Sequence, residues 1–522
     1  MGKRVNKSIR ALLESSVSRT PGKPLFAFKD QKVTYAEVLG SVNRIANGFL
    51  NLGVKKGDKV AILLPNCLEF PYCWLAANMI GAVMVPVNGR FVGDEIQYIL
   101  NHSEAKLLVT SNRHREILGG IRKGLPFLEH MINIDHYDGE ENLRYSSLLE
   151  NSAVLSQADI DEDDLAVLLY TSGTTGKPKG CMASHYYFVN LGDIQGKLFN
   201  LTAEDRVFTA QPFYYMDPQW NTLMVMTFNA TLAFAEKFSP AKFWDEVRQY
   251  GITCFYCIGS MTSFLFNMPP SELDKKHNVR LVQTSGISPR MHKAWEERFG
   301  VPVYEVYAST ETACDIAVTT EMDRKVGTAF IGRPVYYREA KVVDENDAEV
   351  KPGEEGEIVL KRARGMMTAY YKDPEATEYA FKGGWFHSGD LGYIDEEGDY
   401  HFAGRKKDII RRGGENISAA SIEQVLMTHP GILDAAAIPV PDSIRGEEVK
   451  VYVVLKPGRA VTYEEILKFS EENLGVFKVP RYIELRDSLP KTPSERVQKE
   501  KLKKEREDLT KGCFDRLAST SN

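Results

Sequence analysis

Hydrophobic and polar positions along the chain predict strands that alternate with helices. A helical stretch runs from Leu68 to Gly81, and short apolar runs bounded by turn residues predict strands. Such alternation is typical of layered α/β proteins with largely parallel sheets, whose ligands bind at the carboxyl ends of strands. We therefore expect an α/β fold with functional residues at those ends. The predicted strands cover residues 59–66, 105–111, 164–172, 253–259, 280–286 and 303–309.

The pattern changes twice further along the chain. From about Arg333, Gly- and Asp-rich turns separate short strands, which predicts a small antiparallel or barrel-like subdomain. Residues 403–418 form a charged segment punctuated by glycines, which predicts a domain boundary. Beyond it, residues 448–456 alternate like a strand, and residues 462–473 begin with a capping-box spacing. This region predicts a compact α+β unit.

Composition and charge exclude several classes of protein. The 522 residues carry a net charge of −6 and show no basic stripe of the kind that binds nucleic acid. The N-terminal "MGKRVNKSIRALLESS" lacks the apolar core of a signal peptide, and the apolar stretch at 220–235 is too short to span a bilayer. Seven cysteines, an odd number, argue against a disulfide framework, and Cys254 and Cys257 lie in an apolar run. We expect a cytoplasmic protein with no membrane span and no nucleic-acid partner.

The segment "LLYTSGTTGKPKG", residues 168–180, has the composition of a phosphate-binding loop. Its glycines allow backbone N–H groups to face an anion, while hydroxyl and ammonium groups add donors and charge. It is not a Walker A loop, because Pro178 follows Lys177 where that motif has Ser or Thr. A surface turn is the alternative interpretation, but the strand that leads into the segment favours a nucleotide-phosphate loop.

Four further segments follow this loop in order: "YASTE" (307–311), "GGWFHSGDLG" (383–392), "GRKKDII" (404–410) and "RRGGEN" (411–416). With them, the chain resembles the adenylate-forming superfamily of acyl-CoA synthetases, peptide-synthetase adenylation domains and luciferases, over roughly residues 10 to 505. The resemblance implies a large N-terminal domain of layered sheets and helices plus a barrel-like subdomain, and a small mobile α+β C-terminal domain. The implied boundaries are 1–404, a hinge at 405–409, and 410–522.

The resemblance also implies a reaction. A carboxylate attacks the α-phosphate of ATP to give an acyl adenylate and pyrophosphate, and the thiol of CoA then displaces AMP. Charge that develops on phosphate oxygens needs preorganised donors and a metal, here Mg²⁺. ATP, Mg²⁺ and CoA are therefore expected, with a carboxylic acid as the other substrate, and the protein is expected to form a homodimer.

Site residues follow from the same resemblance. Each of three charged residues has an ordinary structural interpretation: Glu311 as a solvated surface acid, Asp390 as a turn residue and Arg405 as an exposed ion-pair residue. The order of the motifs that contain them matches that of the family, which favours functional roles. Glu311 matches the magnesium ligand, and Asp390, assisted by Arg405, matches the carboxylate that holds the ribose. The residues that match the phosphate loop and nucleotide site are Thr171, Ser172, Gly173, Thr174, Thr175, Lys179, Gly286, Tyr307, Ser309 and Thr310.

The C-terminal motifs imply movement and thiol access. Lys407 matches the hinge position, which must absorb a large backbone change. Gly413, Gly414 and Glu415 match the face that lines the pantetheine passage, although an ordinary glycine turn is an alternative interpretation.

The sequence departs from the family pattern at its C-terminal end. Most relatives have "PKTxSGK", whose last Lys acts in adenylation, whereas residues 490–499 read "PKTPSERVQK". Arg496 keeps a positive charge at that position, but a guanidinium does not replace an ammonium group atom for atom. The candidates for the missing cation are Arg496, Lys499 and Lys491.

A second departure concerns the acyl pocket, in "QPFYYMDPQW" at residues 211–220. Asp217 and Gln219 match the spacing in crotonobetaine/carnitine-CoA ligases, and Ala308 adds a methyl group where many relatives have Gly. With Tyr214, Tyr215 and Trp220, Asp217 forms a candidate aromatic and acidic cage for a quaternary ammonium. An aromatic core cluster is the alternative. The pattern favours a small or medium polar acid.

The sequence therefore predicts an AMP-forming acid–thiol ligase. Two alternatives stay open at this point. One is an adenylation enzyme that loads a separate carrier protein, since the residues after Lys511 are too few for a carrier domain. The other is a noncatalytic nucleotide- or acyl-CoA-binding relative, suggested by the missing Lys.

Overall fold

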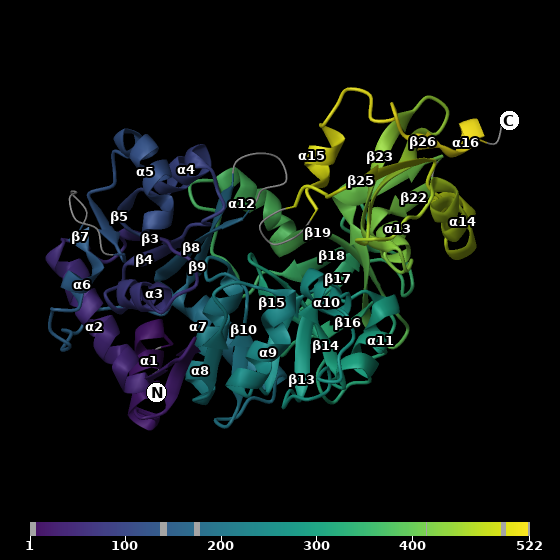
Figure 1. Cartoon of the computed structure of the whole chain (residues 1–522). Helices are drawn as coiled ribbons and strands as arrows, with labels where there is room; N and C mark the ends of the chain where they lie inside the picture. Colours follow the sequence, from purple (N-terminus) through teal and green to yellow (C-terminus); the bar gives the residue numbers. More distant parts are fainter. Residues whose placement is uncertain (1–6, 136–142, 172–177, 414, 492–496, 520–522) are drawn as a thin grey trace.

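A computed structural model describes residues 7–135, 143–171, 178–413, 415–491 and 497–519 (Figure 1). Across these residues the strands form three sheets, two in the N-terminal part and one in the C-terminal part. The C-terminal elements gather at the upper right of Figure 1, apart from the larger N-terminal body. This arrangement agrees with the α/β class and with the small α+β unit that the sequence predicts.

The first sheet has seven strands in the described residues, and its inner strands run parallel. Helices connect the parallel strands, as this topology requires. In spatial order the strands are β7 (Leu143–Arg144), β6 (His130–Asn133), β5 (Ala105–Thr110), β3 (Lys59–Leu63), β4 (Val83–Pro86), β8 (Leu165–Thr171) and β9 (Lys179–Ser184). The helices of this region are α1 (Ile9–Arg19), α2 (Tyr35–Asn51), α3 (Glu69–Met79), α4 (Gly93–Ser103), α5 (Arg115–Ile121) and α6 (Tyr145–Leu148).

The second sheet joins thirteen strands of the described chain. Its strands β10 to β14 are parallel, and from β15 to β20 the pairing is antiparallel. The short antiparallel strands expected after Arg333 are therefore present. They belong to the same sheet as the parallel strands. In spatial order the strands are β17 (Ala340–Val343), β18 (Gly356–Lys361), β19 (Trp385–Ile394), β20 (Tyr400–Arg405), β16 (Phe330–Pro334), β15 (Ala313–Ala317), β14 (Val303–Ser309), β13 (Leu281–Ser285), β12 (Cys254–Ile258), β10 (Arg206–Thr209), β11 (Thr231–Phe234), β1 (Pro24–Phe28) and β2 (Gln31–Thr34). Its helices are α7 (His185–Leu198), α8 (Met216–Phe228), α9 (Pro240–Tyr250), α10 (Gly259–Phe266), α11 (Pro289–Phe299) and α12 (Pro374–Ala380).

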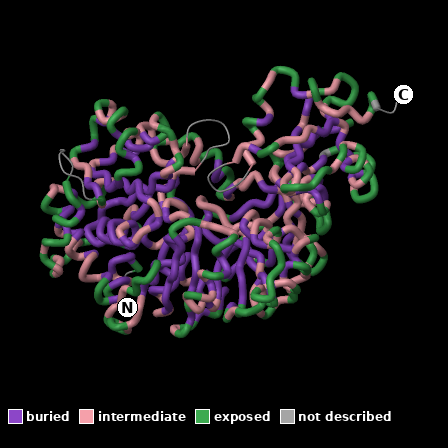
Figure 2. Tube along the Cα trace, in the orientation of Figure 1, coloured by how far each residue is buried: buried purple, intermediate pink, exposed green. Residues whose placement is uncertain are grey.

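One hydrophobic core joins these two sheets. Ile62 on β3 and Leu232 on β11 belong to the same buried cluster as Trp74, Phe188 and Met224 on three intervening helices. Figure 2 shows this buried interior as a continuous purple band through the larger body. Cys254 and Cys257 are buried, as the sequence predicts. The helices of the described residues include none that is long and apolar enough to cross a membrane.

The C-terminal part packs helices against its own sheet. Thr462 Oγ1 accepts a hydrogen bond from the backbone N–H of Glu465, and the backbone N–H of Thr462 donates to the Glu465 carboxylate, so the predicted capping box begins α14. The strands are β21 (Ile409–Arg412), β22 (Glu415–Ser418), β23 (Ile432–Asp442), β24 (Gly446–Leu455), β25 (Tyr482–Arg486) and β26 (Phe514–Asp515), and the helices are α13 (Ala419–Leu426), α14 (Tyr463–Asn473), α15 (Lys499–Lys503) and α16 (Arg516–Ser519).

Candidate active site

Two glycine turns meet where β12 and β13 end. The strands are parallel neighbours, with Ile258 opposite Ser285, so their carboxyl ends share one edge. Gly286 has a φ of +88°, a conformation that favours glycine. A Cβ atom on Gly259 would overlap the carbonyl oxygen of Gly286, so the two turns approach as closely as backbone allows. The backbone atoms of these two glycine turns therefore form this edge of the sheet.

Glu305 holds the Gly286 turn from the neighbouring strand β14. Its carboxylate accepts the N–H groups of Gly286 at 3.0 Å and Ile287 at 2.9 Å. Burial raises the pKa of Glu305 to about 8, although both hydrogen bonds oppose the rise. Sequence reasoning missed this residue, because an acid inside an apolar strand carries no local motif.

Asp390 lies beside Arg405, the residue expected to assist it, and beside Tyr307, a contact that the sequence did not indicate. Asp390 on β19 lies opposite Arg405 on β20 in the strand register. The Tyr307 hydroxyl donates to Asp390 Oδ2 at 2.9 Å, and Arg405 Nε lies 3.1 Å from Oδ1. Burial and the nearby Asp390 raise the pKa of Tyr307 well above its ordinary value, so the hydroxyl remains a donor. The result is a carboxylate oriented by contacts from two strands, β14 and β20.

Thr171 and Lys179, two of the phosphate-loop candidates, lie on the two strands of a hairpin. Thr171 ends β8 and pairs with Lys179, which begins β9. The Lys179 ammonium group lies 5.1 Å from the centre of the Tyr370 ring. Ser172, Gly173, Thr174 and Thr175 lie outside the described residues.

Glu311 lies against this hairpin. Its Oε1 accepts the Tyr370 hydroxyl at 3.2 Å and the Cys181 thiol, on β9, at 3.7 Å. Among the described residues, no donor bonds to Oε2. A carboxylate oxygen left open beside a phosphate-type loop fits Mg²⁺, which takes one or two carboxylates together with phosphate oxygens. Neither Tyr370 nor Cys181 was expected from the sequence, since no motif marks them.

A second acidic group does not fit a metal site. Asp395, Glu397 and Asp399 point their carboxylates together, but the ammonium group of Lys325 lies within 3.2 Å of all three. This lysine already supplies the positive charge there.

The residues after Tyr307 form a turn held by polar contacts. Ser309 Oγ lies 2.8 Å from Thr312 Oγ1, and the carbonyl of Thr310 accepts the Tyr187 hydroxyl at 2.9 Å. Ala308 pairs with Cys314 across β14 and β15. These contacts fix the direction in which the chain reaches Glu311.

Two of the acyl-pocket candidates meet an unexpected partner. The indole N–H of Trp220 donates to Asp217 Oδ1 at 3.4 Å, and its ring packs edge-on against Tyr256 at 5.4 Å. The Tyr256 hydroxyl in turn donates to Ser285 Oγ at 3.0 Å. The rings of Tyr214 and Tyr215 pack against each other, with ring centres 4.8 Å apart. Tyr256 was missed because its strand, "TCFYCIG", is typical of buried core.

The C-terminal candidates occupy two places. Lys407 lies in a short 3-10 turn between β20 and β21, where burial lowers its pKa. Gly413 has a φ of +59° and donates its N–H to the carbonyl of Arg445 at 2.9 Å, while Glu415 pairs with Arg412 in the β21–β22 hairpin. Gly414 lies outside the described residues.

The candidates for the missing adenylation cation differ in their contacts. Lys499 is 12% exposed and binds Glu423 at 2.7 Å, with Asp408 at 3.7 Å, within the C-terminal part. Lys491 binds Asp434 at 2.7 Å, and its ammonium group also lies 5.1 Å from the ring centre of Phe264 in the N-terminal part. Arg496 lies outside the described residues.

Comparisons with known proteins agree with this geometry. A family model described as AMP-binding enzyme matches residues 13–371, and one described as AMP-binding enzyme C-terminal domain matches residues 421–496. A crotonobetaine/carnitine–CoA ligase of Salmonella arizonae is 36% identical over 483 residues, which is 91% of this chain and 93% of that protein. A ligase of the same name from Escherichia coli is 36% identical over 90% of this chain and 93% of its own length.

Two solved structures share the whole fold. The anthranilate CoA ligase AuaEII in complex with anthranoyl-AMP has a TM-score of 0.90 at 25% identity, with 96% of this chain and 98% of that chain covered. ATP-bound MatB from Rhodopseudomonas palustris has a TM-score of 0.87 at 27% identity, with 97% and 100% covered. Both cover the C-terminal part as well as the N-terminal part.

Proposed function

The chain belongs to the AMP-binding enzyme family of ATP-dependent acid–CoA ligases, and we propose that its acid is a small zwitterion with a quaternary ammonium group, of the carnitine or crotonobetaine type. The first half-reaction joins the acid to AMP, and the second transfers the acyl group to the thiol of CoA.

The observation that carries the proposed site is the position of Glu311 beside the β8–β9 hairpin. With Oε2 open, Glu311 would hold the Mg²⁺ that accompanies ATP, and that ion would supply charge to the phosphate oxygens. Thr171 and Lys179 flank the loop that would receive the phosphates. Asp390, oriented by Tyr307 and Arg405, would accept the ribose hydroxyl groups.

The rest of the nucleotide site is proposed on the shared strand edge. The Gly286 turn offers exposed main chain for a planar base, and Ser309 and Thr310 end the strand that leads to Glu311. Carboxylate attack at the α-phosphate needs the acid to enter from this same edge. The Trp220–Tyr256 pair and Ala308 lie on the elements that would border it.

The acid is proposed from two independent observations. Curated relatives at 36% identity are named crotonobetaine/carnitine–CoA ligases. In this chain, Trp220 and Tyr256 place two aromatic rings together beside the carboxylate of Asp217. Ring faces and a carboxylate attract a quaternary ammonium, which cannot donate a hydrogen bond.

For the second half-reaction, the C-terminal part offers the β21–β22 hairpin. Beside Gly413 and Arg445 lie exposed apolar side chains, Ile444 at 90% and Phe477 at 44%, and Arg412 Nη1 donates to the Phe477 carbonyl. These apolar side chains, with the partly exposed Arg445 beside them, offer a surface for the nucleotide end of CoA. The hinge at Lys407, the domain boundaries, the homodimer and the cytoplasmic location remain predictions.

The test is pyrophosphate release from Mg-ATP, with and without CoA. The acids compared are carnitine, crotonobetaine and an acid with a tert-butyl group in place of the trimethylammonium group. We expect release with the charged acids, faster turnover with CoA, and loss of release in Glu311→Gln. The exposed Glu321→Gln variant is the matched control.

Other outcomes redirect the proposal. Equal rates with the tert-butyl acid would remove the quaternary ammonium from the argument. Pyrophosphate release without acyl-CoA formation would favour loading of a separate carrier protein. ATP binding without release from any acid would favour the noncatalytic alternative.

A further inference from the structure

Residues 367–371 run beside β9 as an extended segment. Tyr370 forms an isolated antiparallel bridge with Cys181, so the two residues lie directly opposite each other. The backbone N–H of Met367 also donates to the carbonyl of Glu311 at 2.8 Å. The segment thus joins the hairpin of the first sheet to the turn of the second sheet that carries Glu311. Its hydrogen bonds with β9 are Thr368 N–H to Met182 O (2.9 Å), Met182 N–H to Ala369 O (3.0 Å) and Tyr371 N–H to Gly180 O (2.7 Å).

The side chain of Tyr370 contacts both charged groups of the proposed phosphate site. Its hydroxyl donates to Glu311 Oε1 at 3.2 Å, and its ring lies 5.1 Å from the Lys179 ammonium group. A cation near a ring face is attracted by the ring, and a hydroxyl donor orients a carboxylate. One aromatic side chain therefore contacts both an acid and a base of the proposed site.

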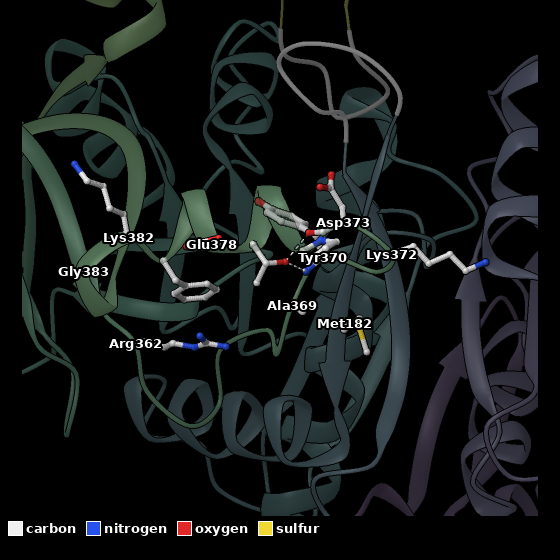
Figure 3. Close-up of a pocket in the computed structure, with 12 residues that line it drawn as sticks. Met182, Arg362, Ala369, Tyr370, Lys372, Asp373, Glu378, Lys382 and Gly383 are labelled. Carbon is white, nitrogen blue, oxygen red and sulfur yellow. Dashed lines mark hydrogen bonds between the residues drawn. The ribbon is translucent and has the colours of Figure 1, made fainter.

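Tyr370 is anchored on its far side to α12. Its backbone N–H donates to Thr377 Oγ1 at 2.9 Å, and Asp373 caps the helix through the N–H of Ala376 at 3.0 Å. Figure 3 shows Tyr370 in the wall of a pocket of about 750 Å³ between this helix and β9. Tyr370 also packs, partly buried, against the main hydrophobic core, so both packing and polar contacts set its orientation.

We propose that Tyr370 is a positioning residue for metal–nucleotide binding: its hydroxyl holds Glu311 in the orientation that leaves Oε2 open, and its ring keeps Lys179 from pairing with that carboxylate. The inference rests on the proposed function, because it takes Glu311 as the carboxylate that meets the metal of Mg-ATP. A partner of a metal ligand commonly changes metal affinity by about 10- to 100-fold when it is removed.

The chain offers a matched control at the next residue. The side chain of Tyr371 lies on the opposite side of the segment, with its hydroxyl 3.5 Å from Glu104 and its ring edge-on to His102. Tyr371→Phe removes an equivalent hydroxyl from the same segment without touching Glu311. The comparison with Tyr370→Phe therefore separates the contact with Glu311 from a general effect on the segment.

The experiment measures binding, not turnover. Calorimetry follows the binding of α,β-methylene-ATP across a range of Mg²⁺ concentrations. The methylene bridge between the α- and β-phosphorus atoms of this analogue cannot be cleaved. Binding of AMP without Mg²⁺, measured in the same way, tests whether the nucleotide site of each variant is folded. We expect Tyr370→Phe to need about 10-fold more Mg²⁺ for half-saturation, with AMP binding unchanged. Tyr371→Phe is expected to match the wild type.

The outcomes separate the inference from the proposed function. If the wild type depends on Mg²⁺ and Tyr370→Phe shows the same Mg²⁺ requirement, the role of Tyr370 is overturned while the proposed function stands. Equal weakening of AMP binding would also overturn it, because the variant would then have lost the site as a whole. Nucleotide binding by the wild type that is independent of Mg²⁺ would overturn both.

Discussion

Replacing Glu305 with Gln is expected to change how the stability of the protein depends on pH. In the folded state the carboxyl group is buried, and burial raises its pKa from 4.5 to about 8. Between these two values the unfolded chain releases the proton while the folded chain keeps it. The free energy of unfolding therefore falls as pH rises through this window.

The magnitude follows from the size of the rise. At about 1.4 kcal/mol for each pH unit, a pKa that moves from 4.5 to about 8 corresponds to about 5 kcal/mol of stability lost by pH 8. Gln has no such titration. Two N–H groups face this side chain, however, and Gln has one accepting oxygen, because its NH₂ group can only donate. The unpaired N–H group costs about 1–3 kcal/mol at every pH.

The two effects have opposite signs, so the difference between variant and wild type should change sign. Below pH 4.5 the variant is expected to be the less stable protein, and at pH 8 the more stable one. Melting temperatures of both proteins, measured at one scan rate across this range, provide the comparison. A difference that stays constant with pH would mean that Glu305 is ionised in the folded state, against the reasoning from burial.

Glu296→Gln provides a control of the opposite sign. Burial acts to raise the pKa of Glu296, but hydrogen bonds from His292, Val303 and Arg324 outweigh it and leave the pKa lowered. The ionised Glu296 carboxylate therefore stabilises the folded state above the ordinary pKa of a glutamate. This contribution to the free energy of unfolding is lost as pH falls. The Glu296→Gln variant should therefore be less stable than the wild type near neutral pH and approach it in acid.

Three further predictions concern the site. Asp390→Asn should slow single-turnover pyrophosphate release by roughly 10- to 100-fold, since a charged hydrogen-bond acceptor is lost; an unchanged rate would remove its role at the ribose. Gly259→Ala should lower stability by about 1–3 kcal/mol, because the added methyl group meets the Gly286 carbonyl; an unchanged melting temperature would contradict the close approach. Lys491→Ala should slow the first half-reaction more than Lys499→Ala, because the Lys491 ammonium group also lies against Phe264 of the N-terminal part, whereas both ion-pair partners of Lys499 lie within residues 406–426; the reverse order, measured by adenylate formation, would reassign the cation.

Much of the fold was predictable, because its signals are local. The strand expected at residues 303–309 is β14, and the capping-box spacing at Thr462 begins α14 where expected. The helix expected from Leu68 to Gly81 is α3, shorter by a residue or two at each end. Periodicity and caps depend on neighbours within a few positions, so one sequence carries them.

The partners within the site were less predictable, because they depend on distant packing. Asp390 and Arg405 were expected to act together from motif order, and the sheet register places them opposite each other. The contact of Tyr307 with Asp390 was not expected. The contact of Glu311 with Tyr370 spans 59 positions and has no motif. Lys499 also looked available in the sequence, whereas it pairs with Glu423 on a helix far along the chain.

The register of β19 and β20 has a consequence for engineering. Asp390 lies opposite Arg405, which is the last residue of β20, and the 3-10 turn at Lys406–Asp408 follows at once. A chain cut or joined just after Arg405 would therefore keep both partners of this ion pair on one fragment. C-terminal parts of relatives could then be exchanged at this peptide bond as modules, while the proposed ribose contact stays with its original host.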